Sequence, residues 1–370
     1  MNNAWAWDIV GGRPETGSSP QLRETMVPES EGAELTSVAA LLARMHDIRP
    51  DNLQLHRRRL PGGLESTSVA WVAARYTDRL GRRRVFTLVV KHLHGDTTRE
   101  ALVYRHLLAG GTAEIAPRVL ATQRHGSAGT VLYLEAVHRT AAWPWKDIRA
   151  IETVLHQVAR LHETVPSRHS AAALDAWNYE AQANETALLT IGRLEELPRH
   201  PDLTHVRRGA RWAGRVATAL PALRRQLLTF APFGRGPIHG DLHSGNAVMR
   251  RRLGRDEPVI LDWGRARFGS PLEDVSSWLQ SLGFWDSEAR RRHDTLLASY
   301  LSSRGMDRRL GTDLRTAYWL AGASNALAGA LLHQLTLLTD KKTTPARWAR
   351  AASSARQWLR ILRRADAMWR

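Results

Sequence analysis

Strand-forming residues in this chain are concentrated between about residue 50 and residue 137, and this order limits the fold more than any other feature. Two runs rich in β-branched and aromatic residues, Val69–Tyr76 and Val85–Lys91, predict strands on either side of a turn-like segment. Two more strands are predicted near Arg118–Thr122 and Thr130–Val137. Because helical patterns dominate the rest, the sequence predicts an α+β fold in which a small β-rich lobe precedes a larger, mostly helical lobe.

The predicted helices follow from apolar periodicity and from capping residues. A short apolar helix is expected from about Thr36 to Met45, and Asp96-Thr97 is an N-cap signal for a helix that ends before Gly110-Gly111. After Pro144, apolar residues recur on one face of a segment that ends at Pro166. Further helices are predicted over Leu174–Leu197 and Arg207–Leu228 and from Leu272 onward, with a strand–loop–strand element at Pro237–Val248 and Pro258–Asp262.

Composition restricts the environment of the chain. Its 370 residues are 43% hydrophobic and contain no run of about 18 apolar residues, so no transmembrane segment is expected. The start, with Trp5, Trp7 and Asp8, lacks the basic-then-apolar order of a secretory signal. The absence of cysteine excludes disulfides and thiolate metal sites and fits a reducing compartment, so we expect a cytoplasmic protein.

The net charge of +17 is unevenly distributed. Basic residues concentrate between Arg199 and Arg225 and in the last thirty residues, where nine Lys/Arg accompany the single Asp366. A positive field attracts phosphates, acidic peptides or nucleic acid and repels polycations, although solvated helix faces would give the same composition. We find no nucleic-acid recognition motif, so no specific nucleic-acid partner is expected. An apolar stripe in Pro345–Arg370 predicts an amphipathic helix that either packs on the large lobe or contacts a membrane or an acidic partner.

The segment His239–Asn246 reads His-Gly-Asp-Leu-His-Ser-Gly-Asn and carries the clearest chemical signal. An aspartate followed five residues later by an asparagine is the kinase catalytic-loop arrangement, in which the carboxylate accepts the proton of a substrate hydroxyl and the amide oxygen holds magnesium. A short apolar strand then delivers Ile260–Gly264, where Asp262 would coordinate magnesium directly and Gly264 would permit a sharp turn. Alternatively, His239, Asp241 and His243 form a metal triad, although no further ligand motif supports it.

These motifs resemble those of the aminoglycoside phosphotransferase family, the small-molecule branch of the kinase-like fold that also includes choline and homoserine kinases. The resemblance spans roughly residues 55–305 and rests on H-G-D-x-x-x-x-N and I-D-W-G. It implies a kinase-like bilobal fold that binds ATP or GTP with Mg²⁺. The implied site residues are Asp241 as base, Asn246 and Asp262 as metal ligands, and His239 and Asp274 as structural supports of the loop.

The resemblance extends to the predicted small lobe. Lys91 ends a strand where the family has its ATP-binding lysine, and Glu100 stands in the next helix as the expected ion-pair partner. An ordinary strand-end lysine and a first-turn glutamate are the structural alternatives. The other implied nucleotide contacts are Gly62, Gly63 and Ser66 in a loop over the phosphates and the backbone of Glu135 beside the adenine.

The expected organisation has four parts. Residues 1–35 form a flexible leader, 36–137 the nucleotide-binding lobe, 138–340 the catalytic and acceptor-binding lobe, and 341–370 the basic amphipathic helix. The expected reaction is transfer of the γ-phosphate of ATP to a hydroxyl of a small molecule such as a sugar, an antibiotic or another natural product. Because the chain is strongly basic, we expect an acceptor that is not polycationic.

Two other functions are compatible with the same residues. One is phosphorylation of Ser or Thr in an acidic peptide of a peptide natural-product pathway. The other is a kinase-like fold that binds an acidic partner without catalysis. If the acceptor site is acidic in spite of the basic composition, six carboxylates are candidates to line it: Glu180, Glu185, Glu195, Glu196, Asp286 and Glu288. Three tryptophans would either stack on the acceptor or pack in the core: Trp177, Trp278 and Trp285.

Overall fold

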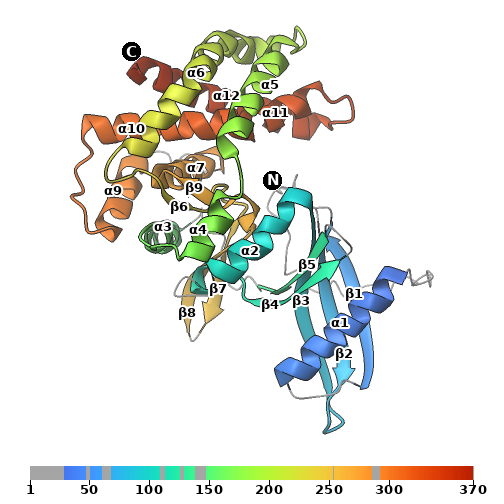
Figure 1. Cartoon of the computed structure of the whole chain (residues 1–370). Helices are drawn as coiled ribbons and strands as arrows, with labels where there is room; N and C mark the ends of the chain where they lie inside the picture. The colour runs from blue at the N-terminus through green and yellow to red at the C-terminus, as the bar shows by residue number, and fades with distance from the viewer. Residues whose placement is uncertain are drawn as a thin grey trace. The chain divides into compact units, whose positions relative to one another are not determined.

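The chain divides into two compact units, each containing one part of the predicted site. The computed structural model describes residues 29–46, 51–60, 68–108, 113–125, 129–137, 147–252, 254–285 and 292–369. The first unit contains the described residues up to 141 together with 250–264, and the second contains those in 142–249 and 265–370. Figure 1 shows most of the strands in the first unit and most of the helices in the second.

The first unit is built on a five-stranded antiparallel sheet with the order β1-β2-β3-β5-β4. Helix α1 covers one face, where Val38 and Leu42 pack with Val72, Leu88 and Val90. Lys91 follows Val90 in the strand, so the alternation of side chains places it on the opposite face. The strands are β1 (Asp51–Leu60), β2 (Ser68–Thr77), β3 (Arg83–His94), β4 (Val119–His125) and β5 (Gly129–Glu135).

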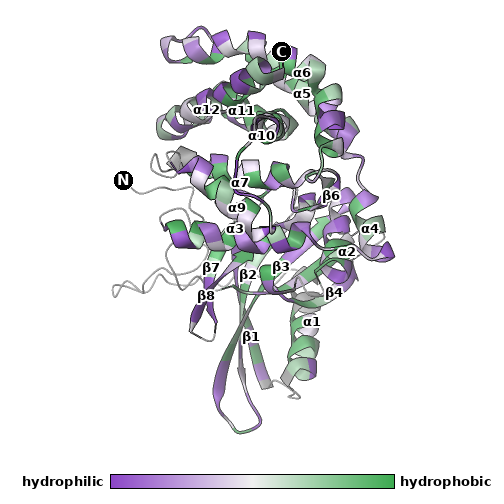
Figure 2. Cartoon of the chain, turned by 90° about the vertical axis from the view of Figure 1, so that its left-hand side faces the viewer, coloured by the Kyte–Doolittle hydropathy of each residue, from purple (hydrophilic) through white to green (hydrophobic). Residues whose placement is uncertain are grey.

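The four strands predicted in this region are present, and the structure adds β1 at the sheet edge. Its run Arg57-Arg58-Arg59 does not read as a strand, but charged residues are common on edge strands because they discourage pairing with other chains. The tip between β2 and β3 is likewise hydrophilic (Figure 2). Helix α1 (Glu29–His46) begins seven residues before the predicted Thr36.

The helix predicted from Asp96-Thr97 is divided in the structure. Residues Gly95–Thr98 form a 3₁₀ turn, and helix α2 (Arg99–His106) follows it. Thr97 Oγ1 accepts a hydrogen bond from the backbone N–H of His94 at 2.8 Å, so it caps the 3₁₀ turn and not α2. This division sets where the first residues of α2, Arg99 and Glu100, lie; both are buried.

The second unit consists mainly of helices. The segment predicted as one helix over Leu174–Leu197 is two helices, because Asn178 caps α5 by accepting a hydrogen bond from the N–H of Ala181. The helices are α3 (Ile148–His162), α4 (Arg168–Asp175), α5 (Tyr179–Glu195), α6 (Thr204–Thr229), α7 (Pro271–Trp285), α9 (His293–Ser303), α10 (Thr312–Asn325), α11 (Leu331–Thr339) and α12 (Pro345–Trp369).

Three short strands position the motifs. Strand β6 (Gly236–Ile238) precedes the His239–Asn246 segment and pairs antiparallel with β9 (Arg267–Gly269). Strand β7 (Ala247–Arg252) follows that segment and pairs with β8 (Arg255–Ile260), which leads to Asp262. The His239–Asn246 segment and the Asp262 turn are therefore each fixed at both ends by a strand.

The apolar stripe predicted at the end of the chain packs on the second unit. In α12, Ala355, Leu359 and Leu362 are buried against neighbouring helices that include α6, α10 and α11. Gly209 of α6 makes room for this contact, since a Cβ there would lie 2.6 Å from Leu359 Cδ1. The stripe is thus part of the core and is not available for a membrane. No helix in the described part of the chain combines the length and apolarity needed to cross a bilayer.

Candidate active site

In the first unit, the ammonium group of Lys91 joins two carboxylates. Its Nζ lies 2.6 Å from Glu100 Oε2 and 2.6 Å from Asp262 Oδ1. The Lys91 and Glu100 side chains are buried, whereas that of Asp262 is 41% exposed. Burial alone would lower the pKa of Lys91, but the two carboxylates outweigh it and raise that pKa, so the ammonium stays charged. The structure therefore brings Asp262, predicted from its motif, together with Lys91 and Glu100, which the family resemblance implied.

The turn that carries Asp262 is held in an unusual backbone conformation. Asp262 has φ of 60°, in the left-handed region that costs a non-glycine residue about 1–2 kcal/mol. The sequence assigned the sharp bend to Gly264, but the left-handed residue is Asp262 itself. Trp263 is fully buried and its indole N–H donates to the carbonyl of Ile260 at 2.8 Å. Contacts of this kind offset the strain and direct the carboxylate outward.

In the second unit, the His239–Asn246 loop presents an exposed carboxylate and a fixed amide. The Asp241 side chain is 40% exposed, and its backbone N–H donates to His239 Nδ1 at 3.2 Å. The Asn246 amide is buried and donates through Nδ2 to the carbonyl of Asp241 at 3.0 Å. Because this bond uses the NH₂ group, the amide carbonyl of Asn246 points the other way and is oriented to accept a ligand.

The buried carboxylate of Asp274 holds the start of this loop. It accepts hydrogen bonds from the backbone N–H of His239 at 2.7 Å and of Gly240 at 2.8 Å. Burial would raise the pKa of Asp274, but hydrogen bonds from His162 and from the loop lower it below its ordinary value. Gly240 is required here, because its φ is 81° and a Cβ would lie 2.2 Å from the carbonyl oxygen of Arg265.

His162 lies behind Asp274 and was not predicted as part of the site. Its Nε2 is 3.1 Å from Asp274 Oδ2, and its Nδ1 is 2.8 Å from the Tyr300 hydroxyl. Burial lowers the pKa of His162, so the ring is neutral, with Nε2–H donating to Asp274 and Nδ1 accepting from Tyr300. The sequence signal was a histidine on the apolar face of a predicted helix.

Two buried arginines anchor the loop to the helices and were also missed. Arg267 donates to the carbonyl of Gly240 at 3.1 Å and to Glu273 at 2.6 Å. Glu273 also accepts from Arg224 at 2.6 Å. The ring of Tyr179 contacts both guanidinium groups, with its centroid 3.5 Å from that of Arg267 and 4.6 Å from that of Arg224. A single charged and aromatic network thus connects α5, α6 and α7 to the loop.

The structure describes some of the remaining predicted residues and not others. Gly62, Gly63 and Ser66 lie outside the described residues. Glu135 ends β5, its backbone N–H donates to the carbonyl of Arg118 at 2.9 Å, and its side chain accepts a hydrogen bond from Arg250. Trp278 is fully buried and belongs to the core, whereas Trp177 is half-buried.

The oxygen ligands at the site suit magnesium better than a histidine-rich metal site. Within the described ranges, no group of three or more His, Asp or Glu side chains converges, so His239, Asp241 and His243 do not form a metal triad. Magnesium is bound in proteins by one or two oxygen ligands together with substrate phosphates. In the first unit the half-exposed carboxylate of Asp262 has this chemistry, and in the second unit the amide oxygen of Asn246 has it.

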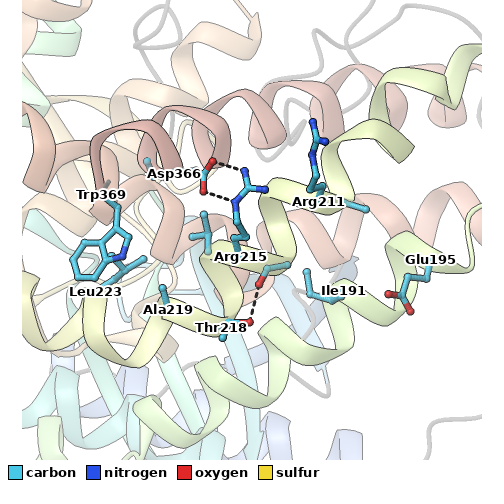
Figure 3. Close-up of a pocket in the computed structure, with 13 residues that line it drawn as sticks. Ile191, Glu195, Arg211, Arg215, Thr218, Ala219, Leu223, Asp366 and Trp369 are labelled. Atoms are coloured by element: carbon cyan, nitrogen blue, oxygen red, sulfur yellow. Dashed lines mark hydrogen bonds and ion pairs between the residues drawn. The ribbon is translucent and has the colours of Figure 1, made fainter.

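A separate pocket of about 640 Å³ lies between α5, α6 and α12 (Figure 3). The ion pair between Arg215 and Asp366 crosses it, with Nε and Oδ1 2.8 Å apart. Glu195, one of the carboxylates considered for the acceptor, lines this pocket. None of the residues predicted to act in catalysis, nucleotide binding or metal binding lines it, so the pocket is not assigned to phosphotransfer.

Comparison with known proteins identifies the family. The model of the phosphotransferase enzyme family matches residues 75–312, more than half of the chain. The chain belongs to this family. As a family member it is a small-molecule phosphotransferase with an alcohol group as acceptor. No curated protein matches its sequence.

Solved structures confirm the kinase-like fold. An ethanolamine kinase of Plasmodium vivax is 10% identical with a TM-score of 0.54, over 81% of this chain and 80% of that one. An aminoglycoside phosphotransferase of Alicyclobacillus acidocaldarius is 14% identical with a TM-score of 0.51, over 94% and 98%. The amicoumacin kinase hAmiN, solved with AMP-PNP and Ca²⁺, is 15% identical with a TM-score of 0.51, over 92% and 96%. At these identities the likeness concerns the fold.

Removing the Asp274 carboxylate should destabilise this phosphotransferase strongly. In Asp274→Ala, the buried N–H of His239, the partly buried N–H of Gly240 and the buried His162 ring lose their acceptor, and we expect a loss of roughly 3–5 kcal/mol in the free energy of unfolding. Asp175→Ala is the control, because that side chain is 54% exposed in its ion pair with Arg235 and should contribute less than about 1 kcal/mol. Urea unfolding followed by tryptophan fluorescence measures both, and equal losses would contradict the assignment of Asp274 as the support of the loop.

Proposed function

We propose that this phosphotransferase transfers the γ-phosphate of ATP, with Mg²⁺, to a hydroxyl group of a small molecule that is not a polycation. The observation that carries the proposal is the contact of Lys91 with both Glu100 and Asp262, because a buried ammonium held this way is a ready partner for phosphate oxygens. The His239–Asn246 loop would supply Asp241 for the acceptor hydroxyl and Asn246 as a metal ligand.

Lys91 would bind the α- and β-phosphates, with Glu100 fixing its direction from α2. Magnesium, when bound, neutralises charge on the phosphates, and its proposed ligands are Asp262 and Asn246. Phosphate oxygens would then replace Asp262 as the partner of the Lys91 ammonium. By the family resemblance, Gly62, Gly63 and Ser66 would cover the phosphates, and the backbone of Glu135 would contact the adenine.

Asp241 would orient the acceptor hydroxyl and take its proton. As the hydroxyl oxygen forms a bond to the γ-phosphorus, the bond from that phosphorus to the β-phosphate oxygen breaks and ADP leaves. The proton passes to the Asp241 carboxylate, which is exposed enough to return it to water. Catalysis would come mainly from positioning, for which Asp274 and Arg267 fix the loop backbone.

Pairing of the carboxylates next to the loop supports an acceptor that is not a polycation. Arg224 and Arg267 neutralise the neighbouring carboxylates of Glu180 and Glu273, so these two groups are not left to attract a cationic acceptor. Glu180, one of the carboxylates considered for an acidic pocket, accepts from Arg224 Nε at 2.6 Å and Nη2 at 2.8 Å, so it is already matched by a cation.

The other acidic candidates add little to an acidic pocket. Glu196 pairs with Arg193 at 2.8 Å, and Glu195 lines the pocket between α5, α6 and α12. Asp286 and Glu288 lie outside the described residues. Trp177 remains a candidate for stacking on the acceptor, because its half-buried ring lies 5.9 Å from the Arg265 guanidinium and 5.8 Å from that of Arg267.

Replacing the proposed base should separate chemistry from binding. Asp241→Asn keeps the size of the side chain but cannot accept the hydroxyl proton, so kcat should fall by roughly 10²–10⁴-fold. The Kd for ATP should stay within about threefold, since the nucleotide contacts are assigned to other residues. Steady-state turnover and calorimetry give the two values, and near-normal turnover would remove Asp241 from the mechanism.

The metal assignment is tested at Asp262. In Asp262→Ala the magnesium-dependent gain in ATP affinity should be lost, because the carboxylate is the only charged ligand proposed for the ion. Asp256→Ala is a matched control in the same unit, where Asp256 pairs with Arg251 at the surface. Calorimetric titrations with and without Mg²⁺ measure the gain, and an unchanged gain in the Asp262 variant would refute the assignment.

The acceptor is tested with a panel of compounds of graded charge. Neutral sugars and nucleoside-like antibiotics should be phosphorylated with a higher kcat/KM than kanamycin-like aminoglycosides, since one charge pair at 4 Å contributes on the order of 4 kcal/mol at an effective dielectric near 20. Acidic Ser/Thr peptides and GTP are included as the alternative acceptor and donor. Aminoglycoside turnover at about 10⁴ M⁻¹s⁻¹ or above would overturn the charge argument.

A further inference from the structure

Two neighbouring residues of α2 hold two neighbouring residues of the Asp262 turn, all within the first unit. The carboxylate of Glu100 accepts a hydrogen bond from the backbone N–H of Trp263. One residue earlier in the helix, Arg99 donates through Nη2 to the carbonyl of Gly264. The helix therefore contacts the backbone of the turn twice, in addition to the contact of Lys91 with the side chain of Asp262.

The turn needs such contacts because of its backbone conformation. Asp262 occupies the left-handed region with φ of 60°, which persists in a non-glycine residue only where the surroundings determine it. Its carboxylate is 41% exposed, so packing alone does not fix it. Gly264 is also the last residue of the segment 250–264 that belongs to the first unit, so its carbonyl lies where this segment ends.

The burial of Arg99 indicates that its contact is structurally important. Arg99 is 8% exposed, and removing a guanidinium from water is costly unless its N–H groups find acceptors. Arg105, one turn and a half later in the same helix, is exposed and donates to Thr122 Oγ1 at 2.9 Å. The two arginines thus belong to the same helix, but only Arg99 is buried and only Arg99 donates to the Asp262 turn.

We propose that Arg99 is a positioning residue for the magnesium-binding turn. By fixing the Gly264 carbonyl to α2, it keeps Asp262 in the left-handed conformation that directs the carboxylate toward the metal. The inference rests on the proposed function, in which Asp262 is a metal ligand. Residues that orient a ligand in this way typically change metal affinity by about 10–100-fold when they are replaced. Because Arg99 also connects α2 to the turn, it keeps Glu100 and Asp262 at fixed positions around the Lys91 ammonium.

The test compares Arg99→Ala, Arg99→Lys and the control Arg105→Ala in the full chain. Arg99→Ala should raise the Mg²⁺ concentration needed for half-maximal ATP binding by about tenfold or more, with metal-free ATP binding nearly unchanged. Arg99→Lys should recover part of this shift, because an ammonium can still donate one hydrogen bond to the carbonyl. Arg105→Ala should behave as the unchanged chain.

Hydrogen exchange of the peptide that covers residues 260–264 gives a second readout that requires neither metal nor nucleotide. Exchange at the Trp263 amide should be faster in Arg99→Ala and unchanged in Arg105→Ala. Unchanged exchange together with an unchanged Mg²⁺ dependence in Arg99→Ala would overturn the inference. If the unchanged chain itself shows no Mg²⁺-dependent ATP binding, the proposed function fails, and the exchange measurement alone decides whether Arg99 holds the turn. If Arg99→Ala does not fold, Arg99→Lys supplies both readouts.

Discussion

The buried ammonium of Lys91 is the contact on which the first unit's part of the site depends. A charge removed from water must be matched, and Lys91 is matched twice, by Glu100 from α2 and by Asp262 from the turn after β8. This requirement brings one strand, one helix and one distant turn together. The alternation of side chains in β3 makes this contact possible. Val90 packs under α1, so Lys91 lies on the opposite face of the sheet.

The second unit also buries a charged group that must be matched, but there the charge is negative. There the buried charge is the carboxylate of Asp274, and it is matched by backbone N–H groups and a neutral histidine. Arg267 adds a cation that binds the loop carbonyl of Gly240 on one side and Glu273 on the other. Rigid partners on both sides leave Asp241 as the exposed carboxylate of a fixed loop, which is what a group that must meet a substrate requires.

The same network bears on the choice of acceptor. Arginine and aromatic side chains alternate from Arg224 through Tyr179 and Arg267 to Trp177, and the carboxylates of Glu180 and Glu273 are paired with arginines. Some of the chain's arginines are therefore buried near the loop and do not lie on solvated helix faces. This pairing supports the proposal that the acceptor is not a polycation, because it leaves Glu180 and Glu273 without unmatched negative charge.

The sequence alone determined the fold class and the chemically distinctive residues. Strand patterns predicted four of the five strands in the sheet. Motif spacing identified Asp262, the family resemblance implied Lys91 and Glu100, and the structure brings the three residues into contact. Such residues are visible in a sequence because their chemistry limits them to few amino-acid types. Strand β1 was missed because its arginines mask the alternation of an edge strand.

Only the tertiary structure showed how these residues are held. His162, Arg267 and Arg99 look in the sequence like an ordinary helix residue and two ordinary basic residues, and their roles come from partners far along the chain. The left-handed residue of the metal turn is likewise Asp262 and not the nearby glycine. The physical reason is that the cost of burying a charge or straining a backbone is offset by contacts between distant segments, and no local pattern records which segments will meet.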